Sequence, residues 1–367
     1  MRVPFVDLTV VTDQIKDAYL EAVSRLLDKK HFILTEEVEE FEEAWAEKCQ
    51  VRYCVGVSCG ADALYLALVA ARIRPGDEVI TQGNAYNATV VAIMRAGGVP
   101  RFADIDEDTL TLDLSKIEAL INEKTKAILP VHLFGQANDM TSISELAKKH
   151  KLAVIGDCAQ AHLAEFDGKP VGAFGDAAAF SFYPTKNLGA FGDAGAVTTN
   201  SEKIYQEIMA RRNLGQVAKN DHQYFGFNMR LDPMQAIALN LKLRYLEENT
   251  EVRKQAGEYY DKLIAWADLP LRPVQKIKGA NHVYHLYVAQ SMKMDRDDLR
   301  KRLLELEVET AVHYPLPVYR QPFYEGPKDP CPVTDKVLGR IISLPMFVGI
   351  TRQQQEYVVE SLIKILK

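Results

Sequence analysis

The stretch RYCVGVSCGADALYLALVAARI, residues 52–73, sets the pattern for the first half of the chain. A short apolar run ends in small residues, and a helical pattern follows directly. Four more apolar runs, DEVITQ, RFADID, KAILPVH and LAVIGD, recur at similar intervals up to about residue 200. This alternation is the βαβ rhythm of a doubly wound α/β domain with a mostly parallel sheet. Ligands of such sheets bind beyond the carboxyl ends of the strands, so we expect functional residues just after the apolar runs.

A smaller α+β unit is predicted after this sheet. Residues 231–264 read as one long helix with Pro233 in its first turn, where the missing N–H of proline carries no penalty. A strand pattern, HVYHLYVAQ, and two helical patterns, RDDLRKRLLELEVE and RQQQEYVVESLIKILK, follow. We therefore predict a large domain over residues 1–247 and a small C-terminal domain over residues 248–367.

The composition is typical of soluble globular proteins. The chain has 367 residues, 47% of them hydrophobic, and its 44 basic and 50 acidic residues give a formal net charge of -6 without a charged tail. We expect no nucleic-acid or membrane partner and a cytoplasmic location, since charges interrupt the first residues too early for a secretory signal. Five cysteines without CxxC spacing predict neither disulfides nor a metal site, and we expect them to be reduced core residues.

One lysine stands out in SFYPTKNLGAFGDAGAV, residues 181–197. Lys186 lies among small, aromatic and glycine residues with no other positive charge. A lysine in an apolar setting has a lowered pKa and forms Schiff bases with carbonyl groups, including that of pyridoxal phosphate. The alternative is a lysine that snorkels from a strand end.

An acid, an anion site and an aromatic side chain follow other predicted strands. Asp157 could pair with a protonated pyridine nitrogen, although an aspartate there could also cap a helix. The turn at Gly60 and Ala61 opens a helix whose N–H groups could bind phosphate, and it is no Walker A loop. Tyr86 could stack on a flat ring or pack between loops. Together with Lys186, these residues are the parts of a pyridoxal phosphate site.

A different reading of the DCAQAH motif treats Cys158 and His162 as a nucleophile and its base. Neither an oxyanion hole nor a third orienting group is visible in the sequence, which weighs against this reading.

With these motifs in order, the chain resembles the DegT/DnrJ/EryC1/StrS family of sugar aminotransferases, which have aminotransferase fold type I. The resemblance extends from VPFVDL through SCGADAL, DCAQAH and NMRLDPMQAIAL to HYPLPVYRQP. It implies a cofactor, pyridoxal 5'-phosphate, that passes through pyridoxamine 5'-phosphate. Lys186 matches the lysine of the Schiff base and Asp157 the acid under the pyridine nitrogen. The other cofactor contacts that the resemblance implies are Gly60, Ala61, Tyr86, Gln160, Ser181 and Asn228.

The resemblance also implies the reaction and the assembly. Asn228 matches an asparagine that reaches the phosphate of the other subunit, which implies a homodimer with shared active sites. Because Lys186 is present, we expect transamination from L-glutamate to the keto carbon of a nucleotide-linked sugar. His162 favours C-3 of a dTDP-3-keto-6-deoxyhexose, and the alternative is a C-4 keto-sugar or cyclitol aminotransferase. Candidate sugar-nucleotide contacts are His162, Tyr183, Lys219, Tyr224, His313 and Tyr314.

Two departures from the family pattern lie near the predicted site. Cys59 stands where the family often has serine, and Leu163 replaces a frequent glycine. A non-catalytic binding or regulatory protein of the same fold is a third hypothesis, and the presence of Lys186, Asp157 and Gln160 argues against it. A surface polysaccharide, a glycoprotein glycan and an antibiotic are all open as destinations of the amino sugar.

Overall fold

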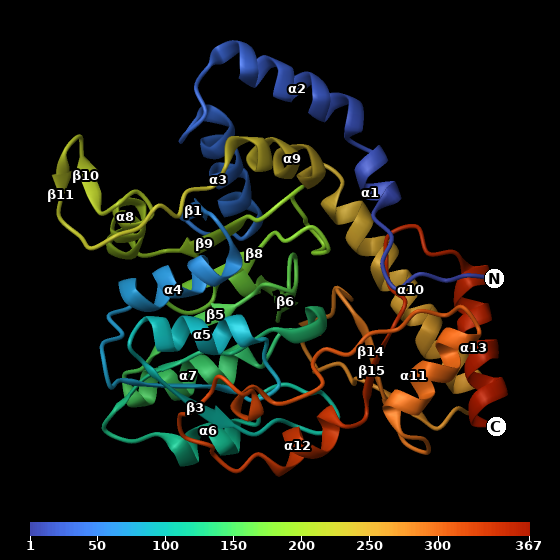
Figure 1. Cartoon of the computed structure of the whole chain (residues 1–367). Helices are drawn as coiled ribbons and strands as arrows, with labels where there is room; N and C mark the ends of the chain where they lie inside the picture. Colours follow the sequence, from blue (N-terminus) through green and yellow to red (C-terminus); the bar gives the residue numbers. More distant parts are fainter.

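The computed structural model describes the whole chain, residues 1–367 (Figure 1). Its main sheet has seven strands in the order β1-β9-β8-β5-β4-β2-β3. Strand β9 is antiparallel to β1 and β8, and the other pairs are parallel. The predicted α/β domain with a mostly parallel, mixed sheet is thereby confirmed. The strands are β1 (Tyr53–Val57), β2 (Glu78–Gln82), β3 (Val99–Ala103), β4 (Thr125–Ile128), β5 (Ala153–Asp157), β8 (Ala177–Ser181) and β9 (Gly195–Thr199).

Helices cover both faces of this sheet because its strands carry apolar side chains on both faces. Successive residues alternate between two cores: Val79 packs into one and Ile80 into the other, and Ala127 and Ile128 do the same. One face of the sheet is covered by α4 (Gly60–Ala70), α5 (Asn87–Arg95) and α8 (Glu202–Arg211). Their apolar side chains pack against strand side chains in the first core. The second layer contains α3 (Glu36–Lys48), α6 (Leu114–Leu120), α7 (Met140–His150) and α9 (Pro233–Leu243).

The C-terminal part of the chain has the predicted α+β character. Its separate three-stranded sheet and its helices share a core of their own, on the right of Figure 1. The two predicted C-terminal helices are confirmed as α11 and α13. The first residues of the chain also lie here, since Val3 pairs with Val308. The domain boundary at residue 247 stays a prediction. The elements are β12 (Leu271–Pro273), β14 (Tyr287–Ser291), β15 (Ile341–Leu344), α10 (Leu246–Trp266), α11 (Arg296–Glu305) and α13 (Arg352–Leu366).

The single long helix predicted over residues 231–264 is wrong. The structure has two helices, α9 and α10, that meet at an angle (Figure 1). At the junction the amide of Tyr245 bonds to the carbonyl of Lys242, three residues back, so the last turn of α9 is tightened. This change of direction lets Leu243 and Leu246 both pack into the core of the main sheet.

The remaining elements are short or peripheral. A C-terminal segment returns to the main sheet, where the Asp104 carboxylate at the end of β3 accepts hydrogen bonds from the amides of Val333 and Thr334. No helix is both long and apolar enough to cross a membrane. These elements are α1 (Thr9–Asp13), α2 (Lys16–Lys29), η1 (Leu133–Gly135), β6 (Glu165–Phe166), β7 (Lys169–Pro170), η2 (Val171–Ala173), β10 (Gln216–Ala218), β11 (Asp221–His222), β13 (Ala280–Asn281), η3 (Val318–Arg320) and α12 (Pro332–Leu338).

Candidate active site

A cavity of about 520 Å³ lies at the carboxyl ends of β1, β2, β5 and β8. This is the edge at which an α/β sheet presents its ligand site. The cavity brings together most of the site residues predicted from the sequence, although they are spread over more than 250 positions. These are Gly60, Ala61, Tyr86, Asp157, Gln160, Ser181, Tyr183, Lys186, His313 and Tyr314.

Lys186 lies in the loop that follows β8. The loop is closed by hydrogen bonds from the Lys186 amide to the Tyr183 carbonyl, 2.8 Å, and from Ala190 to Phe182, 2.8 Å. Only glycine fits at position 189, because a Cβ there would lie 2.3 Å from the Pro184 carbonyl oxygen. Burial lowers the pKa of the Lys186 ammonium to about 8, against the opposing attraction of Asp157. Its amine is therefore available as a nucleophile near neutral pH.

The Asp157 carboxylate is held by one donor on each oxygen. The Thr89 hydroxyl donates to Oδ2 at 2.7 Å, and the Ala159 amide donates to Oδ1 at 3.1 Å. Burial raises the pKa of Asp157, while these two hydrogen bonds and the charge of Lys186 oppose the rise. The arrangement keeps an acceptor in place for a cationic ring nitrogen. Thr89, one helical turn after Tyr86, was not among the predicted site residues.

The Gln160 side chain has a fixed orientation. Its Oε1 accepts a hydrogen bond from the Phe134 amide at 2.7 Å, so its Nε2 must point the other way, where it donates to the Tyr314 hydroxyl at 3.2 Å. The Tyr314 ring in turn lies 5.1 Å from that of Tyr86, with the two planes tilted by 35°. Tyr86 is 54% exposed, which leaves its face open to a planar ligand.

The N-terminus of α4 opens onto the cavity. Its N-cap residue, Cys59, makes no capping hydrogen bond, and the amides of Gly60 and Ala61 donate to no backbone carbonyl. Free amides at a helix N-terminus favour phosphate. Gly60 is required here because a Cβ would lie 2.5 Å from Cβ of Ser181.

One expectation about the cysteines is wrong. Four of the five are buried, but Cys59 is only partly buried and lines the cavity. It lies outside the core because its position is the N-cap of a helix that opens at the sheet edge.

Four of the predicted site residues do not line this cavity. His162 is fully buried among the rings of Trp45, Phe180 and Phe182, and burial lowers its pKa to about 3. The remaining three are Lys219, Tyr224 and Asn228, on and after the β10–β11 hairpin. In Figure 1 this hairpin projects from the large domain beyond α8.

Besides Thr89, three polar residues line the cavity without having been predicted: Thr185, Asp193 and His285. Asp193 lies in the glycine-rich segment after Lys186, and His285 comes from the segment before β14. His285 had no local signal, since the pattern HVYHLYVAQ looks like one continuous strand. Its position depends on contacts with residues 134–135 and 187, far away in sequence.

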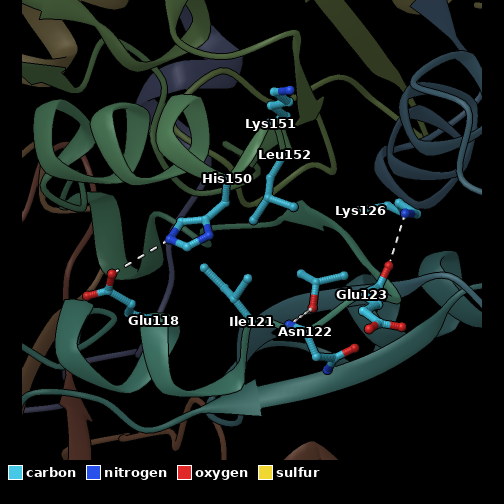
Figure 2. A pocket seen from close by; sticks show the side chains of 9 residues that line it. Glu118, Ile121, Asn122, Glu123, Lys126, His150, Lys151 and Leu152 are labelled. Carbon is cyan, nitrogen blue, oxygen red and sulfur yellow. Dashed lines mark hydrogen bonds and ion pairs between the residues drawn. The ribbon is translucent and has the colours of Figure 1, made fainter.

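A second hollow, of about 490 Å³, lies at the opposite edge of the sheet, where β4 and β5 begin (Figure 2). Nε2 of His150 lies 3.6 Å from Oε1 of Glu118, and the Lys126 ammonium donates to the Glu123 carbonyl at 3.1 Å. Its two lysines, Lys126 and Lys151, are exposed, so this hollow lacks the buried amine of the first cavity.

Comparison with known proteins decides the family. A model of the DegT/DnrJ/EryC1/StrS aminotransferase family matches residues 13–363. The chain belongs to this family. It is therefore an aminotransferase, and aminotransferases of the DegT/DnrJ/EryC1/StrS family use pyridoxal 5'-phosphate.

Individual relatives match along their whole length. A dTDP-3-amino-3,6-dideoxy-alpha-D-galactopyranose transaminase of Aneurinibacillus thermoaerophilus is 40% identical, with 98% of each chain covered. A pleiotropic regulatory protein of Geobacillus stearothermophilus is also 40% identical, over 100% of this chain and 99% of its own. Among solved structures, DesV of S. venezuelae in complex with a ketimine intermediate gives a TM-score of 0.95 at 36% identity, covering 99% and 98% of the two chains.

The residues of the cavity fit the cofactor of this family. Lys186 supplies an amine, Asp157 a carboxyl group for the ring nitrogen, and the α4 N-terminus two backbone amides for the phosphate. Tyr86 supplies an exposed aromatic face and Gln160 an oriented amide.

Proposed function

We propose that this aminotransferase transfers the amino group of L-glutamate to C-3 of a dTDP-linked 3-keto-6-deoxyhexose. The observation that carries the proposal is the cavity itself, because it combines Lys186, Asp157 and Gln160 in a chain 40% identical to a dTDP-3-amino-sugar transaminase over nearly its full length. The same three residues argue for catalysis even though another relative of equal identity is named as a regulatory protein.

The chain's own residues account for the proton transfers. When bound, pyridoxal phosphate supplies an electron sink for the bond cleavage at the amino-bearing carbon. Asp157, whose two oxygens each accept one hydrogen bond, would hold a protonated ring nitrogen through its carboxylate. Lys186, with its amine free, would take the proton from the amino-bearing carbon as a base and give it to the cofactor carbon as an acid. In the sugar half of the reaction it would move a proton in the opposite direction. With a pKa of about 8, the Lys186 amine can both accept and donate a proton near pH 8.

Side chains above the cavity are proposed to bind the sugar. His313 is neutral, since burial lowers its pKa to about 4, and its Nδ1 lies 2.9 Å from the Ser343 hydroxyl. Tyr314 is positioned by Gln160, and Tyr183 lines the mouth of the cavity with 53% of its surface exposed. Hydroxyl and imidazole groups of this kind pair with sugar hydroxyls.

The proposal includes a homodimer in which Asn228 completes the phosphate site of the partner subunit. Asn228 is exposed and does not line the cavity of its own chain. The hairpin and the segment between it and Asn228 carry exposed apolar side chains: Val217 on the hairpin is 47% exposed, and Phe225 after it is 75% exposed. Exposed apolar groups beside a candidate site residue are typical of a subunit interface. Lys219 on the same hairpin is proposed to offset the diphosphate charge.

An absorbance experiment tests the proposal. The protein loaded with pyridoxal phosphate should show the band of the lysine-bound cofactor near the visible edge, and L-glutamate should convert it to the pyridoxamine form. dTDP-3-amino-3,6-dideoxy-α-D-galactose should give the same conversion, whereas dTDP-4-amino-4,6-dideoxy-D-glucose and an aminocyclitol should not. Lys186→Ala should give none of these changes. A faster reaction with the 4-amino sugar or the cyclitol would favour the alternative substrate class.

A further inference from the structure

His285 enters the active site on a segment of the small sheet that docks onto the large domain. The Val283 amide donates to the Gly135 carbonyl at 2.9 Å, and the Leu286 amide donates to the Phe134 carbonyl at 3.2 Å. Phe134 also fixes Gln160. The same turn therefore positions His285 and a predicted cofactor residue, and His285 lines the cavity with 7% of its surface exposed.

The neighbour of Lys186 determines which nitrogen of His285 carries the proton. The Asn187 amide places its Nδ2 against the Val283 carbonyl oxygen at 3.2 Å, and a carbonyl can only accept. Oδ1 of Asn187 must then face Nδ1 of His285, at 3.2 Å. Because Oδ1 also only accepts, Nδ1 must be the donor and carry the proton. In the neutral ring, Nε2 is then an acceptor.

The ring surroundings keep His285 neutral. Its side chain is surrounded by other basic groups: Lys186, Arg253, His313 and His162 all oppose protonation, as does burial, and together they hold its pKa well below the ordinary value. Arg253 is fixed beside it, donating to the carbonyls of Tyr284 and His285 at 3.3 and 3.4 Å. No carboxylate is among these groups.

Nε2 of His285 is the free end of this arrangement. Nε2 makes no hydrogen bond within the chain. Both ring nitrogens of His162 also lack partners but are fully buried, whereas Nε2 of His285 is not fully buried. An acceptor fixed in direction and open to the cavity selects a ligand group that donates a hydrogen bond.

We infer that His285 determines substrate specificity by accepting a hydrogen bond at Nε2 from a hydroxyl of the keto sugar. The inference rests on the proposed function for the identity of the sugar. Glutamate does not fit this role, because its carboxylates only accept hydrogen bonds and its nitrogen is the group being transferred. His285 should therefore act in the sugar half of the reaction and be dispensable in the glutamate half.

The tautomer is tested by nitrogen NMR of the holoenzyme labelled with ¹⁵N-histidine, with His285→Asn to assign the signals. His285 should show a protonated Nδ1 and an unprotonated Nε2 at pH 7, and it should stay neutral below the ordinary histidine pKa of about 6.5. Asn187→Leu, which removes the acceptor, should allow the other tautomer. A protonated Nε2 in the wild type, or a charged ring at pH 7, would overturn the inference whatever the substrate is.

Single-turnover kinetics test the role in specificity. His285→Asn keeps a donor toward Asn187 and loses the acceptor at the Nε2 position, whereas His285→Gln reaches that position with an amide oxygen. With dTDP-3-amino-3,6-dideoxy-α-D-galactose as the probe, His285→Asn should be at least tenfold slower than wild type and His285→Gln intermediate. The rate with glutamate should change less than twofold in both variants.

The outcomes separate the two proposals. Equal slowing of both half-reactions, or none, would overturn the role of His285 while the wild-type reaction with the amino sugar upholds the proposed function. A wild-type protein that reacts with glutamate and not with this sugar would overturn the proposed sugar and its contact together. In that case the NMR result would still decide the tautomer.

Discussion

Lys186 illustrates how a single residue is tuned by its place in the fold. Burial lowers its pKa from 10.5 to about 8. At pH 7 the neutral amine then makes up about one-tenth of the population instead of roughly 0.03%. The rate at which the apoenzyme binds pyridoxal phosphate should therefore rise with pH and level off above a midpoint near 8, since only the neutral form reacts.

Stopped-flow absorbance of the apoenzyme mixed with the cofactor gives this midpoint. Asp157→Asn is the matched variant: Asp157 raises the pKa of Lys186, so its neutral replacement should move the midpoint below 8. A midpoint at 10 or above in the wild type would contradict the role given to burial.

Leu163 occupies a backbone conformation that suits glycine. Its φ is 61°, in the left-handed region, where a side chain costs about 1 kcal/mol. Glycine adopts this conformation without that cost, whereas the leucine side chain packs partly against the second core. Leu163→Ala loses the packing and keeps the strain, whereas Leu163→Gly loses the packing and relieves the strain. We expect the glycine variant to be the more stable of the two by about 1 kcal/mol.

Urea unfolding of both variants checks this order. In most positions alanine is the more stabilising residue, so the reverse order is specific to a left-handed backbone. If the alanine variant unfolds at the higher urea concentration, the backbone at Leu163 is not left-handed in solution.

At the scale of elements, a buried ion pair joins α3, β1 and the end of α8. Oε1 of Glu42 accepts from the Gly56 amide at 2.7 Å and from the Arg212 guanidinium, which also donates to the Gly56 carbonyl at 2.7 Å. Glu42 is 8% and Arg212 3% exposed. The two partners respond differently to loss of the other, because a carboxyl can take up a proton whereas a guanidinium cannot lose one.

We therefore predict that Glu42→Ala destabilises the protein by about 3–5 kcal/mol, since it leaves a buried charge without a partner. Arg212→Met should cost less, about 1–3 kcal/mol, because burial already raises the pKa of Glu42 and favours its neutral form. Glu42→Gln keeps an acceptor for Gly56 and serves as the control. Unfolding free energies from urea titrations at pH 7 give the comparison, and equal losses in Glu42→Ala and Arg212→Met would contradict the asymmetry.

The sequence predicted the elements whose signal is local. Strand ends are marked by the change from an apolar run to small or polar residues, and so Lys186, Asp157, Tyr86 and Gly60 could be placed at one sheet edge. His285 could not be placed there, because its segment is held by hydrogen bonds to residues far away in the sequence. The amides of Val283 and Leu286 donate to the carbonyls of Gly135 and Phe134. His162 shows the opposite case, since a polar residue one turn from Asp157 lies inside an aromatic core.

At the scale of the whole molecule, the proposed shared site can be tested by mixing variants. In a heterodimer of Lys186→Ala and Asn228→Ala chains, one site has a defect from each chain and the other has both native residues, provided that Asn228 acts across the interface. A refolded equimolar mixture should then recover about a quarter of the wild-type activity, from one site in half of the dimers. Each variant alone should be inactive or strongly impaired.

The activity of this mixture shows whether Asn228 acts in the active site of its own subunit or in that of the partner subunit. If Asn228 acted within its own chain, no heterodimer would contain a native site, and the mixture would show only the average of the two variants. A molecular mass of one chain, about 41 kDa, for the active protein would also contradict the dimer.

The order of strands in the main sheet has a consequence for biosynthesis. Strand β1 lies early in the chain, but its neighbour in the sheet is β9, more than 130 residues later, and the cavity also needs His285, His313 and Tyr314. In a polypeptide still being made by the ribosome, β1 therefore lacks its strand partner until residue 199 of 367 has emerged, and the cavity is incomplete until residue 314 has emerged. Cofactor loading should thus be one of the last events in the life of the nascent chain, after translation has all but ended.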